Sequence, residues 1–132
     1  MLKKLLLPVF LICSLVCGAQ VMDVQHYRFE LQVSDHSNSI SGKASITIAF
    51  LSGVSEVVLD LASSDGSYGF EVSGVKEAEQ VLSIVHRHDR LNITLIEPAK
   101  KGDTHTYEIS YHGTPKDGLI ISRNKYTKLL VL

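Results

Sequence analysis

The stretch His26-Tyr27-Arg28-Phe29-Glu30-Leu31-Gln32-Val33 alternates polar and apolar side chains without a break. Successive side chains of a β-strand point to opposite faces, so a period of two, rather than 3.6, predicts a strand with one face on a core. We expect the apolar members of the stretch to face inward and pack in that core; they are Tyr27, Phe29, Leu31 and Val33.

The same alternation returns between Ile40 and Phe50, where apolar residues alternate with Ser41, Lys43, Ser45 and Thr47. The polar residues 34–39 separate the two runs and are suited to a turn. The sequence therefore predicts an antiparallel hairpin near the start of the folded region.

Shorter apolar runs, separated by polar turns, fill the rest of the chain. Predicted strands are Val57 to Leu61, Phe70 to Val72, Val81 to Val85, Leu91 to Ile96, Thr104 to His112 and Leu119 to Ser122. Loops or turns are expected at Ser63 to Gly69, His86 to Arg90, Glu97 to Asp103 and Gly113 to Gly118. Short strands at this spacing, without a long amphipathic helix, predict an all-β fold, either an antiparallel β-sandwich or an open saddle-like sheet.

Residues 1–19 have the composition of a secretory signal peptide: Lys3 and Lys4 precede the apolar run Leu5 to Val16, and small residues follow. The apolar run is too short to span a bilayer, so we expect no permanent membrane anchor. Cleavage after Ala19 would leave Gln20 as the N-terminus. The alternative is lipidation at Cys17, although the preceding Val16 is larger than the lipoprotein signal prefers. We expect an exported, periplasmic or extracellular protein.

Both cysteines, Cys13 and Cys17, fall within the predicted signal peptide, so a chain cleaved after Ala19 can form no disulfide. The cleavage would also remove Lys3 and Lys4 from the 13 basic side chains, leaving 11 against 14 acidic ones, a net charge of −3. Without a basic cluster, nucleic acid is not an expected partner.

The sequence contains none of the motifs HExxH, GxGxxG, Walker A or GxSxG. The best local metal candidate is the pair His86 and His88, which would point the same way on a strand, but no third ligand is visible. A solvated polar hairpin tip is the plainer interpretation. We expect His26 and His112 on polar strand faces and His36 and His105 beside turns.

Other polar and aromatic groups also have simpler interpretations. The hydroxyls of Ser63, Ser64 and Ser67 are expected in a flexible loop rather than in a nucleophile site. Asn92 begins a glycosylation triplet inside a predicted strand. The tyrosine and phenylalanine rings could form a carbohydrate platform, but their alternation favours core packing; they are Tyr27, Phe29, Tyr107 and Tyr111.

Three stretches together resemble the opening of the N-terminal domain in the aminopeptidase N family, the gluzincin aminopeptidases. Asp23 to Leu31 is similar to its D-V-x-H-Y-x-x-x-L strand, and Ile40 to Ala44 is similar to I-x-G-x-A, with Val57 to Leu61 following as a later strand. Tyr111 to Pro115 with Asp117 to Ile120 resembles the Y-x-G-x-P and G-L stretches near the end of the conserved strands. The resemblance covers residues 23–126.

The resemblance implies a saddle-shaped, non-catalytic β-domain that packs on a zinc-containing catalytic domain and limits access to its active site. The family binds zinc through HExxH and a later Glu, and binds the substrate amine through GxMEN; none of these motifs occurs here. We therefore expect no catalytic, cofactor-binding or metal-binding residue in this chain, with zinc and peptide substrates belonging to the full-length family.

The resemblance stops after Tyr126, so we expect the β-domain to be incomplete and 127–132 to be an unrelated tail from a frameshift or premature stop. Unpaired strand edges and uncovered apolar faces would then favour aggregation. Two alternatives stay open: an independent exported β-sandwich that binds a protein or glycan, and a small hydrolase built on His86 and His88.

Overall fold

The computed structural model describes residues 20–117. The predicted signal peptide at 1–19 and everything from 118 onward, including the predicted strand at 119–122 and the tail at 127–132, lie outside the described residues. The strands are β1 (Met22–Ser34), β2 (Ser37–Phe50), β3 (Val54–Asp60), β4 (Gly69–Glu77), β5 (Gln80–Val81), β6 (Ser83–Arg87), β7 (Arg90–Ala99) and β8 (Thr104–Thr114). No helix capable of spanning a bilayer occurs in residues 20–117.

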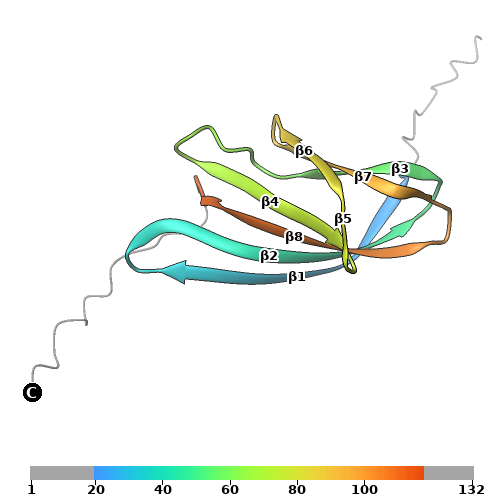
Figure 1. The fold of residues 1–132 in the computed structure, drawn as a ribbon, viewed down its shortest axis with the longest axis horizontal. Coiled ribbons are helices and arrows are strands. Elements are labelled where there is room, and N and C mark those ends of the chain that lie inside the picture. Colours follow the sequence, from blue (N-terminus) through green and yellow to red (C-terminus); the bar gives the residue numbers. More distant parts are fainter. Residues whose placement is uncertain (1–19, 118–132) are drawn as a thin grey trace, which may run out of the picture.

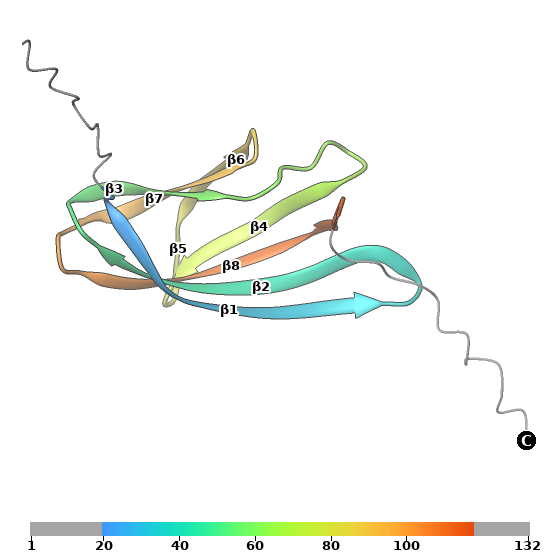
Figure 2. The same ribbon diagram turned by 180° about the vertical axis from the view of Figure 1, so that it is seen from behind.

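The strands form two facing antiparallel sheets, which confirms the predicted all-β class. One sheet has the order β1-β2-β8-β4-β5, and the other has the order β3-β7-β6. Figures 1 and 2 show the two layers close together at the end where β5 lies and splayed apart toward the turn between β1 and β2. The molecule is therefore an open sandwich, not a closed barrel.

Both predicted hairpins are present, but the predicted strand Val81 to Val85 is divided at Leu82: Val81 belongs to β5 in one sheet and Ser83 begins β6 in the other. β1 pairs with β2 so that Phe29 lies opposite Ala44, with register shifts between Val24 and His26 and between Gln32 and Ser34. β6 and β7 are joined by the two residues His88 and Asp89, whose φ angles are 51° and 60°. Two successive positive φ angles are the geometry of the type I′ turn, whose twist matches that of a hairpin.

The core lies where the two sheets are closest. It is formed by inward residues of β2, β3, β4, β7 and β8 together with Leu82, and the side chains buried most completely are Tyr107, Phe50, Ile48, Leu91, Ile93, Val57 and Val75. The prediction that Tyr107 and Tyr111 pack in the core is confirmed, because Tyr107 is buried and Tyr111 packs against the core; Ile109, between them on the same face, is buried too. Alternation along β8 placed these residues correctly.

The first strand differs from the prediction in its packing. Tyr27, Phe29, Leu31 and Val33 share the inward face as expected, but they are 52–61% exposed. The reason is the splay of the sandwich: in both views the β1–β2 hairpin extends away from the three-stranded sheet. Period-two alternation identifies the face of a strand but not whether another layer covers it.

The predicted turn at Glu97 to Asp103 was also partly wrong, because β7 continues to Ala99. Ala99 is 1% exposed and pairs with Val54, next to a register shift in β3. Proline is tolerated in a strand at such an irregularity, so Pro98 does not end β7. The turn itself follows, with the N–H of Lys100 donating to Asp103 Oδ2 at 2.8 Å.

Candidate functional site

An apolar groove of about 430 Å³ opens between the splayed ends of the two sheets. Its walls come from β1, β2 and β8 on one side and from the end of β3 and the start of β7 on the other. It is lined by Tyr27, Phe29, Leu31, Ile40, Ala44, Ile46, Leu59, Asp60, Leu61, Phe70, Leu91, Ile109, Tyr111 and Pro115. Asp60 is the one charged side chain among them, so the groove suits apolar contacts and not acid–base chemistry.

Two glycines of the family-like stretches allow the strands beside this groove to approach closely. A Cβ at Gly113 would lie 2.1 Å from the carbonyl oxygen of Gly69, and Phe70 lies opposite Gly113 in the β4–β8 pair. A Cβ at Gly42 would meet the hydroxyl of Tyr111. These residues therefore have a structural explanation: no larger side chain fits where the strands meet.

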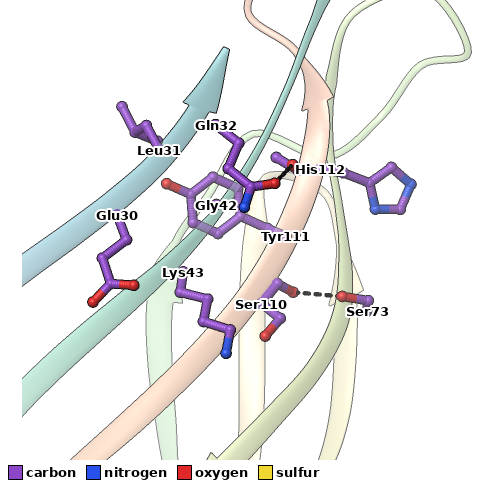
Figure 3. A pocket seen from close by; sticks show the side chains of 10 residues that line it. Glu30, Leu31, Gln32, Gly42, Lys43, Ser73, Ser110, Tyr111 and His112 are labelled. Carbon is purple, nitrogen blue, oxygen red and sulfur yellow. Dashed lines mark hydrogen bonds between the residues drawn. The ribbon is translucent and has the colours of Figure 1, made fainter. Parts of the chain in front are cut away.

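A polar hollow of about 590 Å³ lies on the outer face of the five-stranded sheet (Figure 3). It is lined by Glu30, Leu31, Gln32, Ser41, Gly42, Lys43, Ser73, Ser110, Tyr111 and His112. The hydroxyl of Ser73 donates to the carbonyl oxygen of Ser110 at 3.1 Å, and the hydroxyl of Ser41 donates to Gln32 Oε1 at 3.3 Å. The hollow offers both charge signs and several hydroxyls, which is suitable for weak polar contacts.

The hollow does not assemble a nucleophile and its base. Nε2 of His112 lies 3.5 Å from Glu71 Oε2, and both side chains are more than half exposed. Among residues 20–117, no Ser hydroxyl forms a hydrogen bond with a His ring. An activated serine requires such a bond together with oxyanion donors, so hydrolytic chemistry has no support at this surface.

The predicted pair of histidines is not brought together. His86 lies on β6 and its Nε2 is 2.9 Å from the carbonyl oxygen of Leu61, whereas His88 occupies the turn with positive φ. The prediction that both side chains point the same way on a strand was wrong, because the turn begins one residue after Arg87. The simpler interpretation also needs correction, since His86 is half-buried and hydrogen-bonded rather than solvated.

The loop that contains Ser63 is anchored to this hairpin turn. Asp89 Oδ1 accepts a hydrogen bond from the N–H of Ser63 at 2.9 Å, and the Ser63 hydroxyl accepts one from the N–H of Asp89 at 2.7 Å. The Ser63 end of the loop is therefore hydrogen-bonded to the β6–β7 turn. Further along, Asp65 Oδ1 accepts from the N–H groups of Ser67 and Tyr68 at 2.9 and 2.7 Å.

The remaining sequence candidates are placed as follows. His26 and His112 are exposed on polar strand faces, as predicted, and His36 lies in the β1–β2 turn beside Asp35. The Nδ2 of Asn92 donates to Glu56 Oε1 at 2.9 Å across the β3–β7 pair. The glycosylation triplet thus lies in the central strand of its sheet with its amide already hydrogen-bonded.

Sequence reasoning missed one cluster, at His105. This residue lies at the start of β8 beside the turn, as predicted, but on the inward face and in contact with carboxylates that the sequence did not indicate. Its Nδ1 contacts Glu77, its Nε2 lies 3.7 Å from Asp103 Oδ2, and its ring meets Phe50 edge to face. The sequence does contain one signal for this position: His105 lies two residues before Tyr107, so both side chains point to the same face of the strand. Because the carboxylates contact opposite ring nitrogens, the three groups do not converge on one point.

No group of three His, Cys, Asp or Glu side chains in the described part of the chain could hold a metal ion. The cluster at His105 shows why: a zinc ion must lie about 2 Å from every ligand atom, and Glu77 and Asp103 lie on opposite sides of the imidazole. The donor set of residues 20–117 does not fit the zinc that the resemblance implies for the family.

Comparison with known proteins identifies the fold more closely. No family model matches the sequence, and no curated protein matches it. Among solved structures, an M1 zinc metallopeptidase Glu-to-Ala mutant from Deinococcus radiodurans matches at 30% identity and a TM-score of 0.63, over 74% of this chain and 21% of that chain. A form of the mutant enzyme bound to a Tyr-Ser-Ala substrate matches at 30% identity and a TM-score of 0.62, over 72% of this chain and 21% of that chain.

The β-domain is that of the M1 zinc metallopeptidases. A two-domain M1 metallopeptidase bound to L-tryptophan gives the same result, with 30% identity, a TM-score of 0.63, and coverage of 75% of this chain and 22% of that one. The M1 β-domain described here therefore spans about a fifth of the length of the peptidases it matches. The family resemblance that the sequence indicated is confirmed.

Proposed function

We propose that this chain is the non-catalytic N-terminal β-domain of an exported zinc aminopeptidase and is inert as a peptidase by itself. The observation that carries the proposal is the M1 match, which extends over 74% of the chain but only 21% of the matched peptidase. Peptide hydrolysis by this class requires a metal-activated water and a general base. The sequence lacks HExxH, and the donor groups of residues 20–117 do not converge.

The apolar groove supports a role as a packing domain. Exposed apolar patches on soluble proteins usually mark contact surfaces, and here Tyr27, Phe29 and Leu31 line a groove with a single charged member. In a full-length aminopeptidase this β-domain would pack on the catalytic domain and restrict access to the active site. Peptide substrates and zinc would then be bound by that other domain.

The coding DNA provides the first test. Translating the region after the Tyr126 codon in all three forward frames should reveal HExxH followed by a further Glu. Finding only unrelated sequence there would contradict the proposal and favour an independent module.

An activity assay provides the second test. The purified full chain should show no turnover of aminoacyl p-nitroanilides, with or without added Zn²⁺. Turnover that stays with the protein through two orthogonal purification steps and is abolished by a chelator would contradict the proposal and revive the small-hydrolase alternative.

Export is tested separately. N-terminal sequencing of the protein recovered from the periplasm or medium should begin at Gln20. An N-terminus at Cys17 with the added mass of a lipid would show the lipoprotein alternative, and an intact Met1 in the cytoplasm would contradict export.

The second candidate function is an exported module that binds a protein or glycan. The observation that favours it is the polar hollow of about 590 Å³, which presents Glu30, Lys43 and several hydroxyls on an open sheet face. Saturable binding of a glycan or protein that Lys43→Ala weakens, with Lys101→Ala in an exposed turn as the matched control, would support this function.

A further inference from the structure

The longest edge strand of the molecule is β1. Among the described residues it pairs only with β2, and its 13 residues exceed the lengths of the other edge strands, β3, β5 and β6. Proteins usually protect a long edge with Lys, Pro or an internal bulge. Met22–Ser34 contains neither Lys nor Pro.

The bulges of β1 occur at its two ends instead. The register shifts lie between Val24 and His26 and between Gln32 and Ser34, which leaves His26 to Gln32 as a regular stretch. That stretch is centred on Phe29. A strand that pairs antiparallel with a copy of itself needs such a regular segment with a residue on the two-fold axis.

The charges select one register for such a pairing. With Phe29 on the axis, Arg28 of each copy lies opposite Glu30 of the other, so two opposite-charge pairs form. Moving the axis to Arg28 or to Glu30 would instead place like charges directly opposite each other, which is destabilising. An axis between two residues would oppose polar and apolar faces, because side chains alternate with a period of two.

The apolar face agrees with the same register. Each Tyr27 would lie opposite Leu31 of the second copy, and Phe29 opposite Phe29. The rings of Tyr27 and Phe29 already stack, with centroids 5.9 Å apart and planes 8° from parallel. Both side chains are more than half exposed, so a second copy would remove apolar surface from water.

We propose that two copies of this chain associate edge to edge through antiparallel pairing of His26 to Gln32, with Phe29 on the two-fold axis. The product is a continuous ten-stranded sheet with three additional cross-strand contacts on its apolar face and two opposite-charge pairs on its polar face. This association is argued from the edge of β1 and its charges, and it does not depend on the proposed peptidase role. Tyr27, Phe29 and Leu31 also line the apolar groove, so the second copy would lie beside one wall of that groove.

Charge reversal tests the register. Sedimentation velocity of the full chain over a concentration series should show a monomer–dimer equilibrium. Arg28→Glu should weaken the dimer about tenfold, because both opposite-charge pairs become repulsive. The double variant Arg28→Glu with Glu30→Arg should recover most of that loss. Lys101→Glu changes net charge equally in an exposed turn and should leave the dimer unchanged.

Cross-linking tests the axis directly. In a background with Cys13→Ser and Cys17→Ser, Phe29→Cys should form a disulfide-linked dimer under mild oxidation, whereas Val33→Cys should not, since it lies beyond the regular stretch. A chain that stays monomeric at all concentrations would overturn the proposal. The same conclusion holds if the β1 amides of that monomer are protected from hydrogen exchange, because residues 118–132 of the same chain would then cover the edge. A dimer equally insensitive to Arg28→Glu and Lys101→Glu would also overturn it.

Discussion

The hydroxyl oxygen of Tyr111 lies over Gly42, so close that a Cβ on Gly42 would stand only 2.9 Å from it. The two residues are cross-strand partners in β2 and β8. The same Cβ would lie 2.8 Å from the carbonyl oxygen of Glu30 and 3.0 Å from Leu31 Cδ2. The glycine of the I-x-G-x-A stretch and the tyrosine of the Y-x-G-x-P stretch therefore form one packing unit, although they lie 69 positions apart in the sequence.

Gly42→Ala is predicted to destabilise the fold by about 1–3 kcal/mol, the usual cost of overpacking, although alanine is otherwise better than glycine in a strand. The control is Gly74→Ala in β4, because a Cβ there meets no atom within 4 Å. It should be neutral or slightly stabilising. Urea unfolding of both variants measures the difference. Equal stability of the two would contradict the prediction and show that the Tyr111 side chain and the β1 backbone at Glu30 both shift at no cost.

The strands could be predicted from the sequence because a strand with one buried face alternates apolar and polar residues with a period of two. β2 and β8 show this best: their alternating residues Ile46, Ile48, Tyr107 and Ile109 are all buried. The sequence could not predict which part of the sheet has an opposing layer, so Tyr27 and Phe29 were assigned to the core. Coverage depends on where the two sheets splay, and no local pattern encodes that.

The candidate sites were less predictable for a similar reason. The contact between His86 and the Leu61 carbonyl, and the cluster of His105 with Glu77, join residues 25 and 28 positions apart. Their meeting depends on sheet order and not on spacing within a motif. The glycines of the family-like stretches could be recognised from the sequence. Only the structure explains why these positions are glycine: neighbouring strands approach too closely for a larger side chain.

Tyr107→Phe is predicted to stabilise the protein by about 1 kcal/mol, because the Tyr107 hydroxyl is buried without a hydrogen-bond partner among the described residues. Burial, with the nearby Glu77 charge, raises the pKa of Tyr107 above its ordinary value of 10. The unfolded chain therefore loses this proton first, and stability should decline as the pH rises above about 10. The variant should show a smaller alkaline decline.

Tyr111→Phe is the matched control for this prediction. Burial also raises the pKa of Tyr111, but the residue is only partly buried, so its removal should change stability by less than about 0.5 kcal/mol. Guanidinium unfolding from pH 8 to 11 compares the two variants. Loss of stability in Tyr107→Phe would mean that the hydroxyl has a partner outside residues 20–117.

Asp65 is predicted to make the fold sensitive to acid. Hydrogen bonds from the N–H groups of Tyr68 and Ser67 lower the pKa of its carboxyl below the ordinary 3.8. A lowered pKa in the folded state contributes stability above the unfolded pKa, and that stability is lost as the pH falls through the folded pKa. The urea midpoint should therefore fall on acidification below about pH 4.

Asp65→Asn separates the charge from the turn geometry, because the amide oxygen can still accept both N–H bonds without titrating. Its urea midpoint should fall less steeply than that of the wild type between pH 5 and 2.5. Asp65→Ala should lower the midpoint at every pH. An Asp65→Asn curve parallel to the wild type would show that other carboxyls cause the acid response.

Ser63→Ala is predicted to destabilise the protein by about 0.5–1.5 kcal/mol, the usual net value of one hydrogen bond, because its hydroxyl accepts the N–H of Asp89 at 2.7 Å. The loss should appear locally as faster hydrogen exchange of the Asp89 amide. Ser67→Ala in the same loop is the control, since Ser67 contacts Asp65 through its backbone N–H, which alanine retains. If both variants leave the Asp89 amide equally protected, the hydroxyl does not anchor the hairpin turn. The loop is then held there by the bond from the Ser63 N–H to Asp89 Oδ1 and by the bond from the Leu61 N–H to the Asp89 carbonyl oxygen.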